Sequence, residues 1–326
     1  MPFYSHAAHR RHRLRVLLLP AVSRFLIVAL VVVLVGCGTP TPVVSGGLDA
    51  GSPSVDAGAR VDAGPLVDAG STLDAGQAVI DAGVPRCSFY NGKVNCPPLI
   101  TPLLGRDVYW QFPSSPVPAA GFPAVVIYQG SFFAPSGAWG EVPSSALFNG
   151  FQQARLHALL LEHGFTVITP SALGGLAWQT NSGLSWDSTS DKPFIDGMLA
   201  GIRTGTFGPI DMTHVFAAGI SSGGYMASRM AVSYPGVFRA LIIHSGSYAT
   251  CAGVICVLPT TLPALHPPTR FLHGRGDLTV PLYTAETYEQ ALIAQGFVAD
   301  IVIDDAAGHE WLSIAPERIL EWVQSH

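Results

Sequence analysis

The chain has 326 residues, with 17 Lys and Arg against 22 Asp and Glu, and a formal net charge of −5. This acidic balance argues against a nucleic-acid partner, which would favour a basic face. The length and the 48% hydrophobic content are sufficient for one large folded domain together with shorter, separate segments.

The N-terminal residues 1–36 have the pattern of a bacterial export signal. They contain five arginines and no acidic residue, and the stretch 25–35 is wholly apolar. Such a run is too short to span a bilayer comfortably but suits the apolar core of a signal peptide. Leu34-Val35-Gly36-Cys37 resembles the lipobox of bacterial lipoproteins, which implies cleavage before Cys37 and lipidation of its sulfur. The alternative is an uncleaved N-terminal anchor with an incidental cysteine, and both interpretations predict an exported protein.

Residues 37–86 form a segment of different composition, rich in Ala, Gly, Pro, Ser and Val. The triplet Asp-Ala-Gly occurs six times, starting at Asp49, Asp56, Asp62, Asp68, Asp74 and Asp81. Few large apolar residues and regularly spaced acids favour a solvated, extended tether that holds the following domain away from a membrane surface. A calcium-binding repeat is the alternative, but each unit offers only one carboxylate.

The remaining residues 87–326 are expected to form a single catalytic domain. After Cys37 is set aside, they contain four cysteines. An even number of cysteines in an exported chain indicates two disulfides, although three pairings are possible. We favour the local pairs Cys87–Cys96 and Cys251–Cys256, because short loops close easily; the alternative is buried free thiols.

Strand and helix patterns alternate through this domain. The expected strands cover residues 108–112 (an edge strand), 124–128, 165–169, 215–220, 240–244, 270–273 and 298–303. The expected helices cover residues 151–163, 194–204, 225–234, 282–295 and 316–324. This alternation predicts an α/β fold with a mostly parallel sheet covered by helices on both faces.

A serine lies in a turn between an apolar strand and a helix, in Gly219-Ile220-Ser221-Ser222-Gly223. This G-x-S-x-G pattern in a strand–turn–helix context predicts a nucleophile elbow, a sharp turn that exposes the serine hydroxyl. Glycines flank the serine because a Cβ atom would clash in so tight a turn. The alternative is an ordinary Gly/Ser loop, since the chain is rich in both residues.

A nucleophilic serine needs a histidine base, and the base needs a carboxylate that orients it. In α/β-hydrolases the chain order is Ser, acid, His. His309 is the best candidate for the base because it lies in a loop after the last strand. The other downstream histidines are expected to have structural roles or to lie in remote segments; they are His244, His266, His273 and His326.

Asp277 is the best candidate for the acid. It follows a buried strand and precedes a helix, so it should lie at the same sheet edge as Ser221. Asp304 and Asp305 are rivals, but they precede His309 by only five and four residues and are more easily interpreted as strand-end or turn carboxylates.

Two backbone N–H groups are expected to bind the oxyanion of a tetrahedral intermediate. One is the N–H of Ser222, directly after the nucleophile. The other should come from residues 129–132, after the strand 124–128, with Ser131 favoured and Phe132 the alternative. This second loop could instead be an ordinary surface turn.

From about Pro123 to its end, the chain resembles α/β-hydrolase esterases of the polyhydroxybutyrate depolymerase and feruloyl or acetylxylan esterase group. The matching motifs are Asp191-Lys192-Pro193-Phe194-Ile195, Gly219-Ile220-Ser221-Ser222-Gly223-Gly224-Tyr225-Met226, His273-Gly274-Arg275-Gly276-Asp277-Leu278-Thr279-Val280-Pro281 and Gly308-His309-Glu310-Trp311. The resemblance implies Ser221 as nucleophile, Asp277 as acid and His309 as base. Members of the group usually have His-Gly after the oxyanion-loop strand, whereas this chain has Gln129-Gly130.

Aromatic residues in loops or turns near the expected site are candidates for a substrate pocket, although each could equally serve packing. They are Phe132, Trp178, Trp186, Tyr225 and Trp311. The loop 171–191 is the most plausible wall of that pocket. The chain has no metal-ligand cluster and no Gly-rich phosphate loop, so neither metal nor cofactor is expected.

The sequence therefore predicts an exported serine esterase that cleaves carboxylic esters through an acyl-enzyme. Its partners would be an ester substrate, small or polymeric, and a membrane reached through a lipid on Cys37. A serine peptidase on the same fold is the nearest enzymatic alternative. A surface binding module that has lost activity is the other, and an intact Ser, Asp and His set argues against it.

Overall fold

The computed structural model describes residues 84–180 and 185–326. These fall within one of the two units into which the chain divides, residues 74–326. The expected signal segment, Cys37 and the tether up to residue 83 lie outside the described residues. The boundary expected near residue 87 adjoins the first described strand.

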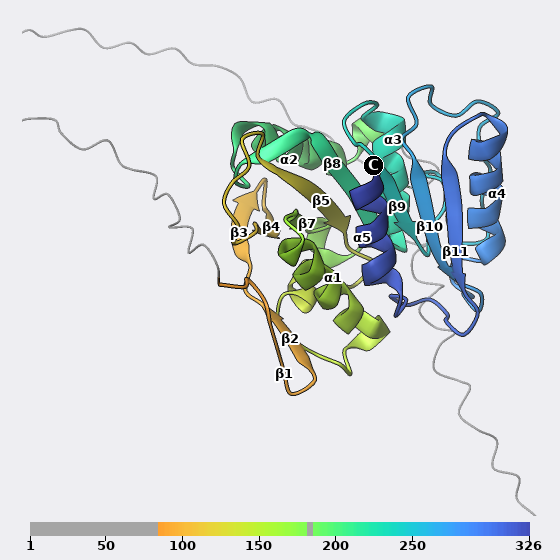
Figure 1. The fold of residues 1–326 in the computed structure, drawn as a ribbon. Coiled ribbons are helices and arrows are strands. Elements are labelled where there is room, and N and C mark those ends of the chain that lie inside the picture. The colour runs from red at the N-terminus through yellow and green to blue at the C-terminus, as the bar shows by residue number, and fades with distance from the viewer. Residues whose placement is uncertain (1–83, 181–184) are drawn as a thin grey trace, which may run out of the picture. The chain divides into compact units, whose positions relative to one another are not determined.

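An eight-stranded sheet organises this domain (Figure 1). Its strand order is β11-β10-β9-β8-β5-β7-β4-β3, and the six strands from β11 to β7 run parallel. The strands are β3 Leu99–Leu103, β4 Arg106–Gln111, β5 Phe122–Tyr128, β7 Thr166–Pro170, β8 Ile210–Ile220, β9 Leu241–His244, β10 Thr269–Gly274 and β11 Ala299–Asp304. The mostly parallel sheet predicted from the alternating pattern is confirmed.

Helices cover both faces of the sheet. The helices are α1 Gly150–Glu162, α2 Asp191–Thr204, α3 Ser222–Ser233, α4 Leu282–Ala294 and α5 Ala315–Ser325. Side chains of α2, α3 and α4 pack with Val126 and Tyr128 of β5 on one face. Those of α1 and α5 pack with Val125 and Ile127 on the other. Because successive strand residues point to opposite faces, the continuous apolar run of β5 contributes side chains to the cores on both faces of the sheet.

A second, three-stranded antiparallel sheet has the order β1-β2-β6. Its strands are β1 Ser88–Tyr90, β2 Lys93–Cys96 and β6 Gly140–Pro143. A disulfide joins Cys87 to Cys96 across β1 and β2, as expected from the local pairing. Val94 is fully buried and packs with the α1 face of the main sheet, so this small sheet extends that core.

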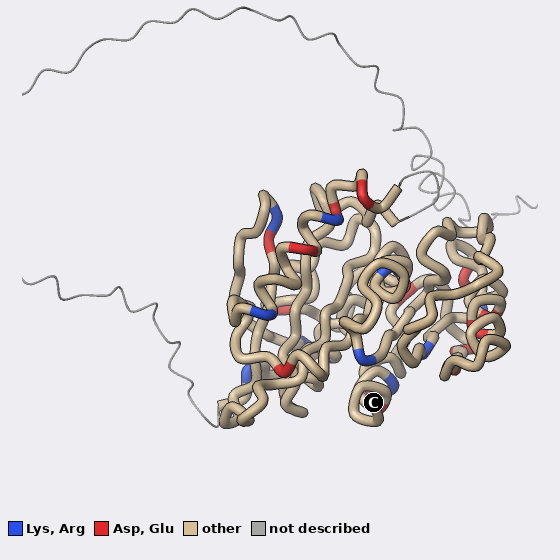
Figure 2. The backbone as a smooth tube through the Cα atoms, turned by 90° about the horizontal axis from the view of Figure 1, so that it is seen from above, with Lys and Arg blue, Asp and Glu red and all other residues tan. Residues whose placement is uncertain are grey.

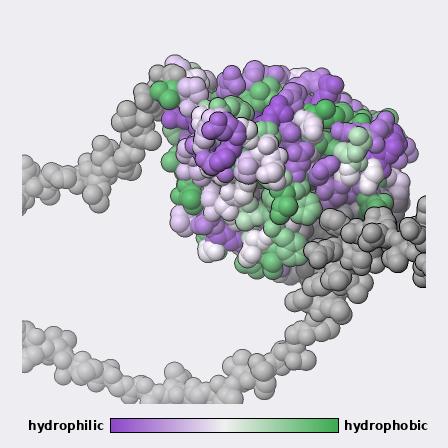
Figure 3. Space-filling view, turned by 90° about the horizontal axis from the view of Figure 1, so that it is seen from below, coloured by the Kyte–Doolittle hydropathy of each residue, from purple (hydrophilic) through white to green (hydrophobic). Residues whose placement is uncertain are grey.

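Four short 3₁₀ turns complete the described structure: Pro135–Ala138, Leu147–Asn149, Leu173–Gly175 and Trp186–Ser188. No helix within the described ranges has the length and apolar character needed to cross a bilayer. Seen from below, the domain has hydrophobic patches between hydrophilic ones (Figure 3).

The strand expected at residues 108–112 corresponds to β4, and it lies inside the main sheet rather than at its edge. β4 pairs antiparallel with β7 on one side and with β3 on the other, so β3 forms the edge. The sequence of β3, Leu99 to Leu103, contains Pro102 and has no fully buried residue. Proline is tolerated at such an edge because one side of the strand needs no ladder hydrogen bonds.

Candidate active site

Ser221 lies at the sharp turn between β8 and α3. Its backbone has φ 56° and ψ −120°, a region that non-glycine residues rarely adopt. The Ser221 N–H donates to the carbonyl of His244 at 2.9 Å, which fixes the turn against β9. The side chain therefore stands at the carboxyl edge of the sheet, above the N-terminus of α3, and the described residues make no hydrogen bond to its hydroxyl.

The glycines around Ser221 are required by close backbone contacts. A Cβ atom on Gly219 would lie 2.3 Å from the carbonyl oxygen of Gly223. A Cβ atom on Gly223 would lie 2.0 Å from the carbonyl oxygen of Tyr128. Both distances are shorter than any real Cβ contact, so no larger residue fits at either position. The turn has the geometry expected of a nucleophile elbow.

Asp277 and His309 form a hydrogen bond at the same edge. His309 Nδ1 lies 2.7 Å from Asp277 Oδ2, and the carboxylate is fully buried. The other carboxylate oxygen accepts the N–H groups of Thr279 and Val280 at 2.9 and 2.8 Å. Because an ionised carboxylate can only accept, Nδ1 carries a proton, and in the neutral ring Nε2 is then the acceptor.

The electrostatics of Asp277 favour its charged form. Burial alone would raise its pKa, but the hydrogen bond and charge of His309, with the Val280 N–H, outweigh burial and hold the pKa below its usual value. A carboxylate that is charged near neutral pH is what an orienting acid requires.

The loops that hold the acid and the histidine are joined by backbone contacts. Gly276 N–H donates to the Ala307 carbonyl at 2.9 Å, and Arg275 N–H donates to the Asp304 carbonyl at 2.9 Å. The two rival acids have other partners. Asp304 accepts the N–H of Ala306 at 3.0 Å, and Asp305 pairs with Arg275 in an exposed ion pair.

His244 connects the serine turn to the histidine loop, a role that its position at a strand end did not reveal. Its carbonyl accepts the Ser221 N–H, and its Nε2 accepts the Leu312 N–H at 3.0 Å. Its ring also lies 5.0 Å from that of Trp311. Burial, together with the nearby charges of His273 and His309, lowers the pKa of His244 well below its usual value, so the ring stays neutral and able to accept.

The loop after β5 passes directly beside the serine. A Cβ atom on Gly130 would lie 3.8 Å from the Ser221 Cβ. The Phe132 N–H donates to the Leu176 carbonyl at 2.7 Å, so this alternative donor is already engaged. No described residue accepts the Ser131 N–H. Ser131 is thus the better placed of the two for binding a ligand.

Gln129, the residue that departs from the His-Gly pattern, ties this loop to the one after β7. Its side chain is buried; Nε2 donates to the Gly175 carbonyl at 3.0 Å and Oε1 accepts the Ala172 N–H at 3.0 Å. The Gln129 carbonyl accepts the indole N–H of Trp178 at 3.1 Å. The backbone N–H of Trp178 donates to Ser222 Oγ at 2.9 Å. The departure from the motif is the only signal in the sequence that points to this role.

The Asp191 motif also has a structural explanation. Asp191 is fully buried at the start of α2, where it pairs with Arg106 of β4 at 2.5 Å. Its second oxygen accepts the Gln179 N–H at 2.5 Å. The motif thus anchors the far end of the loop 171–191 to the sheet.

The aromatic residues proposed for substrate binding differ widely in exposure. Phe132 is 57% exposed at the site edge. Trp178, Tyr225 and Trp311 are 4%, 4% and 2% exposed and belong to the packed interior. Trp186 is partly buried against Tyr234. In this structure, Phe132 alone of the five presents most of its ring to a ligand.

Known proteins with similar sequences are ester hydrolases. A poly(3-hydroxyoctanoate) depolymerase of Pseudomonas fluorescens is 46% identical over 224 residues, which cover 68% of this chain and 80% of that protein. A probable acetylxylan esterase A of Aspergillus clavatus is 32% identical over 115 residues, covering 33% of this chain and 34% of that one. No protein-family model matches the chain.

Solved structures agree on the fold. An acetyl xylan esterase from Aspergillus awamori has a TM-score of 0.51 and 17% identity, and the match covers 68% of this chain and 94% of that one. A thermostable esterase has a TM-score of 0.52 and 16% identity, over 70% of this chain and 62% of that chain. At such low identity these matches establish the fold alone.

The fold and the sequence relatives together define a serine carboxylic-ester hydrolase of the α/β-hydrolase fold. Within that class, the chain belongs to the esterase family that includes the Pseudomonas fluorescens poly(3-hydroxyoctanoate) depolymerase. The predicted fold and enzyme class are confirmed.

Proposed function

We propose that this enzyme is a depolymerase of aliphatic polyesters of the poly(3-hydroxyalkanoate) type, with Ser221, His309 and Asp277 as its catalytic residues. The hydrogen bond between His309 and Asp277, at the edge where the elbow presents Ser221, carries the assignment of the residues. The 46% identity to a poly(3-hydroxyoctanoate) depolymerase over 80% of that protein carries the substrate class.

In the first step, Ser221 Oγ attacks the ester carbonyl carbon while His309 Nε2 takes the hydroxyl proton. Asp277 holds the His309 ring in the required tautomer and stabilises its charged form. The tetrahedral intermediate collapses as the bond to the leaving oxygen breaks, and His309 gives its proton to that oxygen. Water, activated by the same histidine, then cleaves the acyl-enzyme and restores Ser221.

The N–H groups of Ser222 and Ser131 bind the oxyanion in both steps. Ser222 is the first residue of α3, so its N–H has no carbonyl one turn earlier to bond. Ser131 N–H is unengaged among the described residues, and Gly130 brings its loop next to Ser221. Donors fixed in advance stabilise the developing charge without reorganisation.

The loops beside Ser221 suit an uncharged, apolar substrate. Phe132, Leu173 and Leu176 are 57%, 48% and 56% exposed in the loops after β5 and β7. Residues 129–140 and 171–180 contain no Lys, Arg, Asp or Glu. Apolar surface with few polar groups favours aliphatic side chains over sugars or charged peptides.

The test is hydrolysis of p-nitrophenyl acetate and octanoate, a medium-chain poly(3-hydroxyalkanoate) suspension, acetylated xylan and a peptide p-nitroanilide. We expect activity on the octanoate and the polyester, and a loss of about 10³-fold or more in Ser221→Ala. Preferential cleavage of the anilide would indicate a peptidase, and preferential cleavage of acetylated xylan would indicate a carbohydrate esterase. No hydrolysis by the folded wild type would indicate an inactive binding module.

We also propose that the enzyme is exported and anchored by a lipid on Cys37. The arginine-rich start, the apolar run 25–35 and the cysteine after Gly36 support this location. The two disulfides of the domain are consistent with an oxidising compartment. Mass spectrometry of the mature N-terminal peptide should find a diacylglyceryl group on Cys37, whereas an unlipidated chain that starts elsewhere would contradict the proposal.

A further inference from the structure

The loop after β9 exposes apolar side chains in a segment closed by a disulfide. Cys251 and Cys256 are bonded, and Ala252 and Ile255 form a bridge with hydrogen bonds of 2.8 and 3.0 Å. Val254, Ile255 and Val257 are 66%, 66% and 80% exposed. Exposing several large apolar side chains together gives no folding benefit and typically marks a contact surface.

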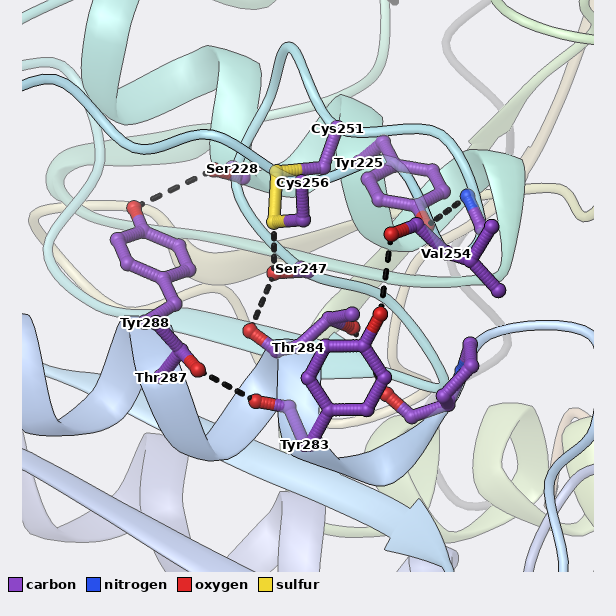
Figure 4. The surroundings of a disulfide bond; sticks show 12 residues. Tyr225, Ser228, Ser247, Cys251, Val254, Cys256, Tyr283, Thr284, Thr287 and Tyr288 are labelled. Carbon is purple, nitrogen blue, oxygen red and sulfur yellow. Dashed lines mark hydrogen bonds between the residues drawn. A yellow bond between two sulfur atoms is a disulfide. The ribbon is translucent and has the colours of Figure 1, made fainter.

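Two tyrosines and a serine hold this loop on its neighbouring helices (Figure 4). Tyr225, in α3, accepts the Gly253 N–H at 3.0 Å, and Tyr283, in α4, donates to the Val254 carbonyl at 3.0 Å. Ser247 lies 3.4 Å from the sulfur of Cys256 and donates to the Thr284 carbonyl at 2.7 Å. The apolar tip is therefore held in place before any ligand arrives, which lowers the entropic cost of binding.

The loop adjoins the acid of the catalytic site. A Cβ atom on Gly253 would lie 3.2 Å from the Thr279 carbonyl, and Thr279 N–H donates to Asp277. Leu278, next to Asp277, is 93% exposed, and Tyr283 is 52% exposed. The exposed apolar residues on the two sides of this contact are Val254, Ile255, Val257, Leu278 and Tyr283, and we call them the loop surface.

The charges near the loop surface indicate which kind of ligand it can bind. Residues 245–269 contain no Lys, Arg, Asp or Glu. Most positions along the coloured part of the tube in Figure 2 are uncharged. An anionic membrane would favour basic residues, which this segment lacks. A second protein copy would need about 800 Å² on each partner, more than five side chains provide. An uncharged aliphatic polymer requires neither basic residues nor so large an interface.

We propose that the loop surface docks the aliphatic side chains of an insoluble polyester and guides the chain to Ser221. This inference rests on the proposed depolymerase function. It adds a second binding surface, on the acid side of Ser221, to the apolar residues beside the oxyanion loop.

The test compares two variants of the full chain. The first is Val254→Ser/Ile255→Ser/Val257→Ser, which removes the apolar tip but keeps the disulfide. The matched control is Ile293→Ser/Val298→Ser, since these side chains are 52% and 58% exposed where α4 ends and β11 begins, away from the carboxyl edge. Each is assayed for adsorption to polyester particles, for polymer hydrolysis and for p-nitrophenyl octanoate hydrolysis.

For the loop variant, we expect adsorption and the ratio of polymer to soluble-ester activity to fall by about 10-fold or more, because three apolar contacts are lost. The control should keep the wild-type ratio. A wild-type ratio and wild-type adsorption in the loop variant would overturn the inference, as would an equal loss of both activities.

Vesicle binding and sedimentation of the same variants distinguish other ligands of the loop surface. Unchanged polymer adsorption with lost binding to phosphatidylcholine vesicles would assign the loop surface to a lipid. Loss of a concentration-dependent dimer would assign it to a second copy. Inactivity of the wild type on every ester would contradict the proposed function, and is distinct from a failure of the docking surface.

Discussion

Both carboxylate oxygens of Asp277 accept hydrogen bonds, and each oxygen has a different role, so we expect substitution of Asp277 to affect catalysis strongly. Oδ1 accepts two backbone N–H groups that shape the acid loop, and Oδ2 accepts the His309 ring. His273 lies beside it, with Nε2 3.5 Å from Oδ2, and donates to the Val280 carbonyl at 2.7 Å. The loop conformation and the histidine tautomer therefore depend on the same side chain.

Asp277→Asn separates these tasks. The amide oxygen can still accept the N–H groups of Thr279 and Val280, but the NH₂ group then faces His309. The ring must turn its unprotonated nitrogen towards the amide, so Nε2 carries the proton and cannot act as base. We expect kcat for a soluble ester to fall by about 10⁴-fold with an unchanged circular dichroism spectrum. More than a tenth of wild-type activity would show that Asp277 is not the orienting acid.

Gln129→Met tests how the oxyanion loop is positioned. Methionine has a similar volume but cannot form the hydrogen bonds with Ala172 and Gly175, so the Ser131 N–H is expected to shift. A displacement of about 1 Å can cost up to 10²-fold in rate, so kcat should fall by about that factor while KM changes little. Gln324→Met, on the exposed face of α5, is the control. Equal kcat in both variants would argue against this role.

The sequence was sufficient to bring Ser221, Asp277 and His309 to one sheet edge, because each follows a strand in a motif with distinctive glycines. It was not sufficient to place the aromatic residues. Trp178 and Trp311 were expected in the pocket because they lie in loops, but the structure buries both rings. Burial of a loop residue depends on which distant segments pack over it, and local pattern does not contain that information.

At the level of elements, the ion pair between Arg106 and Asp191 joins β4 to the start of α2. Arg106 also donates to the Ser190 carbonyl at 2.9 Å, and both charged side chains are almost fully buried. The loop 171–191, which contacts the oxyanion loop, is thereby fixed at its far end.

Asp191→Ala should leave the Arg106 charge buried without its partner. We expect the free energy of unfolding to fall by about 3–5 kcal/mol in urea denaturation. Glu317→Ala removes the half-exposed partner of Arg155 and should cost about 1 kcal/mol or less. Equal effects of the two substitutions would contradict the importance assigned to the buried pair.

The fold was largely predictable because buried parallel strands are continuous apolar runs. The predicted helices and the strands β5, β7, β9, β10 and β11 were found within a few residues of their expected ends, whereas β8 begins earlier than expected. Its first half contains polar residues such as Asp211 and Thr213, which hide the strand pattern. The small sheet β1-β2-β6 was missed because its strands are short and β6 pairs with β2, more than 40 residues away in the sequence.

At the level of the whole domain, stability should depend on pH because burial lowers the pKa of four histidines, three of them strongly. Burial lowers the pKa of His157 to about 3 and that of His266 to about 4, and lowers that of His244 well below its usual value. The unfolded chain takes up these protons near pH 6.5, whereas the folded domain does not. The free energy of unfolding that depends on these neutral histidines is therefore fully present above pH 6.5 and is lost as the pH falls towards their folded-state pKa values.

Each of His157, His244 and His266 should contribute a slope of about 1.4 kcal/mol per pH unit between roughly pH 6 and pH 4. His157→Gln should reduce the measured slope by that amount, whatever its effect on stability at pH 7. Urea denaturation of wild type and variant at several pH values measures this difference. Parallel curves for the two proteins would contradict a neutral, buried His157.

The most direct test of the proposed mechanism is to locate the nucleophile chemically. A serine-directed fluorophosphonate should label the wild-type enzyme once, and peptide mapping should place the label on Ser221. The nearby Ser222 and Ser245 are 8% and 0% exposed, so neither should react. The account predicts no labelling of Ser221→Ala and strongly reduced labelling of His309→Ala. A label on any other serine, or equal labelling of Ser221→Ala, would contradict it.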